Sequence, residues 1–388
     1  MNFTLSDEQQ LLRDGLTKFL STRYRLESSR AAAKTGAGWQ PDIWRAFADE
    51  LGILGAALPE RVGGIGGGPV EIMVIAEALG YALVVEPYVD TAVVAGGLLL
   101  RAQASEATGK SAQASEATGK CAQASEVLQQ LVAGEAIVAL AAAEAQSGDR
   151  WQEVATTARR DGDAWLLDGA KMMALNAPLA THLIVTASTP AGLSLFLVDL
   201  GGDTTGLTVR KVRTVDDRWA ADVLLDGVRA VLLGEEGAAW PSLAQARDEG
   251  AAAVCAEAVG NMRKVLADTI EYSKQRQQFG APIGSFQVLQ HRMVDMHIEL
   301  EQAVAAVYLA VLNLQAEPDQ RARAVSAAKA TVGRAARFIG QNAVQLHGGM
   351  GMTEELAIGH YFKRLTAVQY EFGSTDFHVA RYAALTRA

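Results

Sequence analysis

One carboxylate, Glu371, stands among apolar and small residues in the stretch TAVQYEFGSTDF, residues 366–377. Partial loss of hydration raises the pKa of such a group and suits it to act as a general base. The alternative for Glu371 is a solvated charge at a helix end. Ser374 and His378 lie nearby, but no nucleophile elbow surrounds them, so a hydrolase is not predicted.

The stretch KQRQQFGAPIGSFQ, residues 274–287, contains an arginine, whose guanidinium carries several hydrogen-bond donors, and two aromatic rings. The guanidinium of Arg276 suits a phosphate or pyrophosphate, and the free N–H groups of a helix that starts after the turn would add to it. Phe279 and Phe286 could pack on a flat ring. The passage is typical of a site for an anionic ligand with an aromatic part. The alternative is a surface arginine at a helix end.

A second polar passage, QLHGGMGMTEE, covers residues 345–355. Gln345 offers a side-chain amide, and Gly348 and Gly349 let the backbone approach a ligand closely. Glycines at the end of a helix give the same pattern. His347 has no metal-ligand spacing to another histidine, so a hydrogen-bonded structural role is favoured for it.

Bulk properties exclude several classes of function. The chain has 388 residues, which suggests two or three domains, and its 49% hydrophobic and 20% charged residues are typical of a globular protein. A net charge of −9 argues against nucleic acid or a membrane surface as partners. The N-terminus has no apolar signal segment, and the apolar runs are too short to span a bilayer. Two cysteines without metal spacing suit a reducing compartment, so we expect a cytoplasmic protein.

The elements that must position these residues follow from hydrophobic periodicity, which predicts an α+β fold of three domains. Residues 1–130 show helical spacing, with Ser6 as an N-cap. Residues 131–235 alternate short apolar runs with turn signals and predict an antiparallel β domain. From 236 to 388 the helical period returns, and a long apolar stripe predicts a four-helix bundle.

Glycine-rich stretches predict loops in two places. The stretch GGIGGG, residues 63–68, follows no strand and precedes no GK[ST], so we expect a flexible loop there and not a phosphate site. Asp-Gly pairs are expected at turns between strands. They lie at 161–162, 168–169 and 226–227.

Residues 102–121 hold AQASEATGKS followed by AQASEATGKC, after which AQASE begins a third time. Without this segment the chain reads LLLRAQASEVLQQLVAGEAIVAL, a continuous helix-like passage. The segment is interpreted as a tandem duplication inserted at a surface connection, where insertions are tolerated. No function is expected of it.

Two stretches, RQQFGAPIGSFQVLQHRMVDM and QLHGGMGMTEE, resemble the paired signatures of the acyl-CoA dehydrogenase family, and the helical, β, helical order agrees with it. AVCAEAVGNM and GHYFKRLTAV are similar to the bacterial small-subunit branch that includes pimeloyl-CoA and steroid side-chain enzymes. The resemblance implies an FAD-dependent α,β-desaturation of an acyl-CoA, in which a carboxylate removes the α-proton and a hydride passes to flavin N5. The electrons would leave through an electron-transfer flavoprotein.

The resemblance also implies which residues hold FAD. Arg276, Phe279 and Gln287 match positions that bind the FAD of a neighbouring subunit, and Gln345, His347 and Gly349 match positions that contact its ADP part. The chain is then expected in a homotetramer or an α2β2 heterotetramer. The complete set of residues expected at the cofactor is Arg276, Phe279, Phe286, Gln287, Gln345, His347, Gly348, Gly349 and Ser374.

The β domain departs from the family pattern at the flavin. Ala143 and Glu144 stand where the family has Thr-Glu, so one hydroxyl is missing. Met173 and Leu175 stand where a second segment has Trp and Thr. A lost hydrogen bond near flavin N5 removes roughly 1 kcal/mol, whereas methionine can still pack on a flat ring.

The position of the base departs as well. Phe372 takes the place of the base in the Tyr-Glu-Gly-Thr motif. On a helix the extra residue would turn Glu371 by about 100° away from the flavin, unless the turn is irregular. In a branch whose base lies on an earlier helix, the equivalent place falls on Gly250, one residue after Glu249. Glu371 therefore stays a candidate, and the resemblance adds Glu249, in ARDEG, as a second one. The alternative for Glu249 is a charged helix start.

The leading hypothesis is an FAD-dependent acyl-CoA dehydrogenase. One alternative is a non-catalytic partner subunit of an α2β2 enzyme, and another is a flavin-free scaffold on the same fold. A flavin oxidase or monooxygenase is a further class. Flavin content and the preferred electron acceptor separate these hypotheses.

Overall fold

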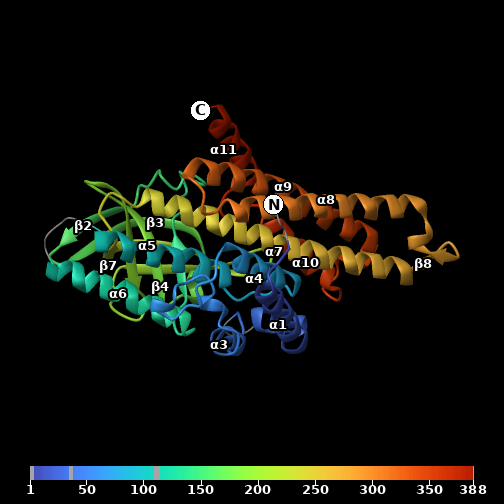
Figure 1. The fold of residues 1–388 in the computed structure, drawn as a ribbon, viewed down its shortest axis with the longest axis horizontal. Coiled ribbons are helices and arrows are strands. Elements are labelled where there is room, and N and C mark those ends of the chain that lie inside the picture. The colour runs from blue at the N-terminus through green and yellow to red at the C-terminus, as the bar shows by residue number, and fades with distance from the viewer. Residues whose placement is uncertain (1–3, 35–37, 109–113, 388) are drawn as a thin grey trace. The chain divides into compact units, whose positions relative to one another are not determined.

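A computed structural model describes residues 4–34, 38–108 and 114–387. Figure 1 shows the order of the elements along the chain. The chain divides into two compact units, which are described one at a time. The first consists of residues 1–31, 69–85 and 251–388, and the second of residues 32–68 and 86–250.

The first unit is helical. In Figure 1, α8 and α9 run side by side, and α10 and α11 pack on α9. The Ser6 N-cap is confirmed, because its hydroxyl accepts a hydrogen bond from the backbone N–H of Gln9 at 3.2 Å. Its helices are α1 (Asp7–Arg23), α4 (Pro69–Tyr81), most of α7 (Trp240–Gln275), α8 (Gln287–Leu312), α9 (Pro318–His347), α10 (Ala357–Ala367) and α11 (Thr375–Arg387).

The predicted apolar stripe forms the inner face of α8. Met296, Leu300, Val307 and Val311 are buried, at the spacing of successive helical turns. Between α7 and α8 the chain makes a short hairpin, and a second tight segment follows α9. The short elements are β8 (Gln277–Gln278), β9 (Ala281–Pro282) and the 3₁₀ turns Ile283–Ser285 and Gly348–Met352.

The second unit contains the β domain and three helices. α2 (Leu26–Lys34) begins in the first unit and ends in the second. The helical elements are α3 (Pro41–Asp49), the π-helix Val89–Ala95, α5 (Gly96–Thr108), α6 (Ala114–Val132) and the 3₁₀ turns Ile53–Gly55, Glu60–Val62 and Ala177–Leu179. The strands are β1 (Val138–Ala141), β2 (Thr157–Asp161), β3 (Ala164–Leu175), β4 (His182–Thr189), β5 (Gly192–Asp199), β6 (Leu207–Arg213) and β7 (Trp219–Leu233).

The seven-stranded sheet closes on itself. Its strands follow the order β1-β4-β2-β3-β7-β5, β5 also pairs with β4, and β6 adds to β7. The prediction of an antiparallel domain is wrong for two pairs, since β1 and β2 run parallel to β4. Parallel neighbours need a long connection, and the β2–β3 hairpin supplies one between β1 and β4. Buried side chains such as Leu167, Val185, Phe196, Val223 and Val228 fill the interior.

Only one of the three Asp-Gly pairs is a turn between strands. Asp161 and Gly162 join β2 to β3, but the other two pairs lie inside the long strands β3 and β7. There Asp168 is the register partner of Asp226, at a β-bulge, and the Gly227 N–H donates to Asp168 Oδ1 at 2.8 Å. The prediction failed because glycine with positive φ serves a bulge as well as a turn.

The glycine stretch at 63–68 is a loop, as expected, and it is tied down. The N–H groups of Ile65, Gly66 and Gly67 donate to backbone carbonyls of residues 55–58. Gly64 fits because a Cβ there would lie 2.0 Å from the carbonyl oxygen of Leu58. These amides are therefore not available to cradle a phosphate.

The duplicated segment 102–121 falls on a pair of helices. Its start lies in α5 and its end in α6, and these two helices pack against each other. Residues 109–113 lie outside the described residues. The helical, β and helical order confirms the α+β class, whereas the boundaries near 130 and 235 stay a prediction. No helix of the described ranges is long and apolar enough to cross a membrane.

Candidate functional site

Glu371 lies in an irregular turn and not on a helix. α10 ends at Ala367 and α11 begins at Thr375. Phe372, the extra residue, has φ 56°, and Gly373 has φ 113°. The rotation expected on a helix therefore does not apply, because α10 ends before Glu371 and the turn that follows is irregular.

Arg364 forms a two-pronged ion pair with the carboxylate of Glu371. Its Nη1 donates to Oε1, and its Nη2 donates to Oε2 at 2.9 Å. The same guanidinium donates from Nε and Nη2 to both oxygens of Glu257, at 2.7 and 2.9 Å. The Arg364 side chain is only 1% exposed, whereas that of Glu371 is 12% exposed. One buried guanidinium thus holds two carboxylates, and Glu371 is the more accessible of them.

Glu249 forms a different kind of ion pair within the second unit. Nη1 of Arg101 donates to both of its oxygens, at 2.9 and 3.1 Å, and Gln245 Nε2 donates to Oε1 at 2.9 Å. A Cβ on Gly97 would lie 2.9 Å from Glu249 Oε2, so α5 approaches the carboxylate closely. The interpretation of Glu249 as a charged helix start is wrong, because α7 begins at Trp240.

Glu144 is buried inside the β domain. Burial raises the pKa of its carboxyl, but hydrogen bonds from Lys171, Thr156 and the Ala155 N–H outweigh this and lower the pKa to about 2. The donors Lys171 Nζ, Thr156 Oγ1 and Ala155 N lie 2.5, 2.7 and 2.7 Å from its oxygens. Burial lowers the pKa of Lys171 to about 8, against the attraction of Glu144. Lys171 also donates to Thr186 Oγ1 at 2.8 Å.

The segments of Ala143 and Met173, which the family resemblance assigns to the flavin ring, lie together beside the Glu144–Lys171 ion pair. Met172 N–H donates to the carbonyl of Ala143 at 2.9 Å, and Met173 N–H donates to Asp222 Oδ1 at 3.1 Å. A bulge in β3 gives Met173 a φ of 49° and leaves its side chain exposed. Leu175 is half-buried, so it offers neither a hydroxyl nor an open surface.

The hairpin between α7 and α8 presents the first polar passage. Phe279 is 94% exposed, and its ring packs edge-on against Phe286 at 6.2 Å. Arg276 and Gln287 are exposed. Among the described residues, the guanidinium of Arg276 has no acceptor, so it is available to an anion. The passage lies between two helices, as predicted, although α7 already ends at Gln275 and a short hairpin takes the place of a simple turn.

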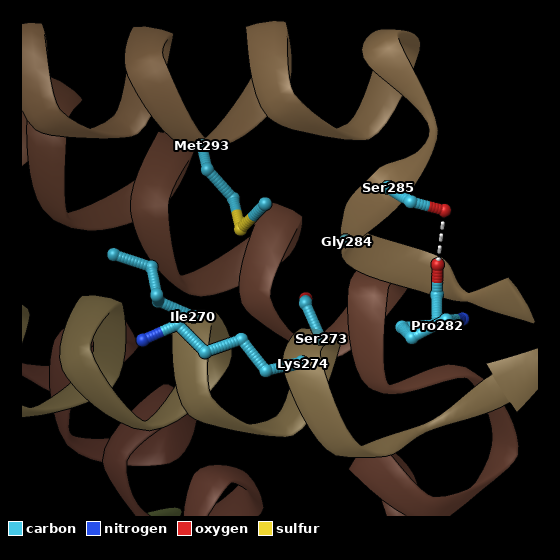
Figure 2. Close-up of a pocket in the computed structure, with 7 residues that line it drawn as sticks. All are labelled: Ile270, Ser273, Lys274, Pro282, Gly284, Ser285 and Met293. Carbon is cyan, nitrogen blue, oxygen red and sulfur yellow. Dashed lines mark hydrogen bonds between the residues drawn. The ribbon is translucent and has the colours of Figure 1, made fainter.

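A pocket of about 330 Å³ lies at the base of this hairpin. Figure 2 shows the side chain of Met293, from α8, pointing toward Ile270 and Lys274 of α7. Ser285 and Pro282 close one side, with the Ser285 hydroxyl donating to the Pro282 carbonyl at 2.7 Å. Apolar walls with a few polar groups suit part of a small organic ligand.

The second polar passage lies at the end of α9. His347 is buried, its Nδ1 donates to the carbonyl of Ala343 at 2.8 Å, and its ring stacks on Tyr272 of α7 at 4.3 Å. Gln345 and Gly348 are exposed, as is Gly349. The stack brings the end of α9 beside the end of α7, where the first passage begins. The favoured structural role of His347 agrees with these contacts.

Two other expected residues have local roles in the structure. Ser374 Oγ accepts a hydrogen bond from Phe377 N–H at 3.2 Å, so it caps the start of α11. His378 is buried next to it and bonds to backbone and to Ser326. Among the described residues no group of His, Cys, Asp or Glu could hold a metal ion.

Comparison with known proteins identifies the family. The description "Acyl-CoA dehydrogenase, N-terminal domain" matches residues 6–135, the middle domain matches 139–228 and the C-terminal domain matches 240–384. The chain belongs to the acyl-CoA dehydrogenase family. The three matches cover nearly the whole acyl-CoA dehydrogenase chain, apart from the linkers and the two ends.

Three relatives illustrate the similarity of this acyl-CoA dehydrogenase. The acyl-CoA dehydrogenase IpdE2 of Mycolicibacterium smegmatis is 27% identical and is covered over 93% of each chain. A solved variant of the Tcur3481-Tcur3483 steroid enzyme is 28% identical, with TM-score 0.85 over 99% of each chain. A glutaryl-CoA dehydrogenase of Mycobacterium smegmatis, solved with FADH2, is 25% identical, with TM-score 0.83 over 99% of this chain and 96% of that one.

The partners of the candidate bases were not predictable from the sequence. Arg364 and Glu257 meet from positions 107 residues apart, and Lys329 reaches the turn of Glu371 from α9. The available signal was a charged residue in an apolar or small-residue stretch, as in SAAKATVGRAA around Lys329. A lone buried charge requires a partner, but the sequence does not say which one.

Proposed function

We propose that the chain catalyses the FAD-dependent α,β-dehydrogenation of an acyl-CoA thioester. When bound, FAD supplies the hydride acceptor for the β-hydrogen, and the chain supplies the base for the α-proton. The solved glutaryl-CoA dehydrogenase relative, which contains FADH2, supports the cofactor. The steroid enzyme and IpdE2 support an acyl-CoA substrate class without fixing the acyl group.

We assign the base to Glu371 in preference to Glu249. A base must gain a proton, and this removes its negative charge from any cation that it neutralises. If Glu371 gains a proton, Arg364 keeps both of its hydrogen bonds to Glu257. If Glu249 gains one, Arg101 loses the carboxylate with which it pairs among the described residues. The shared guanidinium of Arg364 is the observation that carries the assignment.

The α7–α8 hairpin is proposed to hold FAD. Arg276 would pair with the pyrophosphate, as its unengaged guanidinium allows. The open backbone of Gly348 and Gly349 supports close approach by the ADP part, since a Cβ at either would meet nothing within 4 Å. The ring of Phe279, 94% exposed and next to Phe286, leaves an aromatic surface against which a flat ring can pack. This supports a cofactor shared between subunits of a homotetramer or an α2β2 heterotetramer.

The first test is the visible absorption spectrum of the purified chain, followed by anaerobic addition of acyl-CoAs. A bound flavin that bleaches supports a self-sufficient dehydrogenase. No flavin, or a flavin that never bleaches, would instead favour a partner subunit or a scaffold. Rapid reoxidation by oxygen would favour an oxidase or monooxygenase, whereas reoxidation by electron-transfer flavoprotein supports a dehydrogenase.

Substitution of the two candidate bases gives the second test. Glu371→Gln is expected to keep bound flavin and to slow its reduction at least about 10³-fold, in the range of the loss of a general base. Glu249→Gln serves as the matched control and should change the rate far less. Rapid reduction in Glu371→Gln with slow reduction in Glu249→Gln would transfer the role to Glu249.

A further inference from the structure

The turn that carries Glu371 has an unusual backbone. Phe372, with φ 56°, adopts a left-handed conformation, which is unfavourable for a bulky residue. Gly373 follows with φ 113°. Such strained residues persist only when their surroundings hold them, and they gather at functional sites.

Lys329 holds three carbonyl groups of this turn. Its Nζ donates to the carbonyl oxygens of Val368, Gln369 and Gly373, at 2.8, 3.2 and 3.0 Å. An ammonium group has three donors, so each carbonyl has one N–H directed to it. The residue is 1% exposed and lies on α9. Its charge therefore sits against the backbone on both sides of Glu371.

His378 holds the remaining carbonyl at the strained position. Its Nε2 donates to the Phe372 carbonyl at 3.1 Å, and its Nδ1 lies 3.2 Å from the Oγ of Ser326. Ser326 lies one turn before Lys329 on α9. Only glycine fits at position 373, because a Cβ there would lie 2.7 Å from the Nε2 of His378.

We propose that Lys329 is a positioning residue for removal of the α-proton, and this inference rests on the proposed role of Glu371 as the base. Arg364 fixes the carboxylate, and Lys329 fixes the backbone from which that carboxylate extends. Together they set the direction in which the remaining lone pairs of Glu371 point. A displacement of about 1 Å at a reacting group can slow a reaction about 100-fold, so the turn needs this rigidity.

The experiment is single-turnover reduction of the bound flavin in the holoenzyme, followed over a range of acyl-CoA concentrations. Lys329→Met keeps the length of the side chain and removes the donors. We expect retained flavin, a half-saturating acyl-CoA concentration within about twofold of wild type, and a limiting rate lower by about 10–100-fold. Lys264→Met, which removes an ion pair with Asp268 on α7, is the control and should leave the rate unchanged.

Combination with Glu371→Gln distinguishes positioning from general stabilisation. If Lys329 acts through Glu371, Lys329→Met adds little further loss in the Glu371→Gln background. A full multiplicative loss in that background would overturn the inference, as would a wild-type rate in Lys329→Met. Where Lys329→Met fails to fold, Ser326→Ala replaces it, and we expect a smaller loss of a few-fold with the same lack of additivity.

The same measurements separate failure of the inference from failure of the proposed base. Glu371→Gln that reduces flavin as rapidly as wild type removes Glu371 from the mechanism, and the positioning role falls with it. If flavin reduction is slow in Glu371→Gln but normal in Lys329→Met, Glu371 remains the proposed base and only the positioning role of Lys329 is refuted.

Discussion

Replacing Lys171 by methionine tests how the buried pair in the β domain contributes to stability. The carboxyl of Glu144 has its pKa lowered from 4.5 to about 2, so its ionised form stabilises the folded chain at neutral pH. Burial lowers the pKa of Lys171 from 10.5 to about 8, so holding that ammonium group in the interior opposes folding. The intact pair is expected to contribute close to zero overall, because the cost of removing both charges from water offsets their attraction.

Removal of only one partner of the Glu144–Lys171 pair is expected to lower stability much more. Lys171→Met leaves the buried carboxylate of Glu144 without its cation and Thr186 without a donor, a loss of about 3–5 kcal/mol. With an unfolding entropy of about 2.1 cal/mol/K per residue over the chain, the midpoint of thermal unfolding should fall by about 4–6 °C. Unfolding would be followed by far-UV circular dichroism at pH 7.

The control is Arg159→Met in the same sheet. Arg159 and Asp168 form an exposed pair at 3.8 Å, so this change should lower stability by no more than about 1 kcal/mol. The double variant Glu144→Gln with Lys171→Met should recover at least half of the loss, because no buried charge remains unpaired. The reasoning is refuted if Lys171→Met lowers the midpoint no more than Arg159→Met does, or if the double variant is less stable than Lys171→Met.

Three more outcomes are expected. The contribution of Glu144 to the free energy of unfolding is complete above pH 4.5 and is lost as pH falls from there to about 2. The free energy of unfolding of Glu144→Gln should therefore depend less on pH in that window than that of the wild type. Equal slopes of the two proteins in acid titrations would contradict this. Arg276→Ala should retain less than about a tenth of the FAD after gel filtration, because it loses charge-assisted pairing with phosphate. Arg337→Ala, an exposed change on α9, is the control and should retain the FAD. Full FAD occupancy in Arg276→Ala would speak against the shared site. Deletion of residues 102–121 should leave flavin reduction unchanged, and a rate more than about threefold lower would give the repeat a role.

Local motifs were predictable because the residues that define each of them are neighbours in the sequence. The passage around Arg276 and Phe279 carries its own turn signals, and the structure has the hairpin and the exposed ring there. The long apolar stripe of α8 was predictable for the same reason, since helical spacing alone selects Met296 and Leu300 for burial.

The environment of the bases was not predictable, because it depends on contacts between distant segments. The sequence left open whether Glu371 lies on a helix or in an irregular turn. The structure has a turn in which Phe372 adopts a left-handed conformation, and Lys329 and His378 hold this turn from other helices. No local propensity favours phenylalanine in that conformation. The Asp-Gly pair at 226–227 failed for a related reason, since its strand partner decides between a turn and a bulge.

The position of the repeat on α5 and α6 has a consequence for how this gene can change length. Each decapeptide copy corresponds to about 15 Å of helix, at 1.5 Å per residue. Because the segment begins in α5 and ends in α6, which pack against each other, a gain or loss of one copy would change the lengths of these two packed helices and not of the sheet.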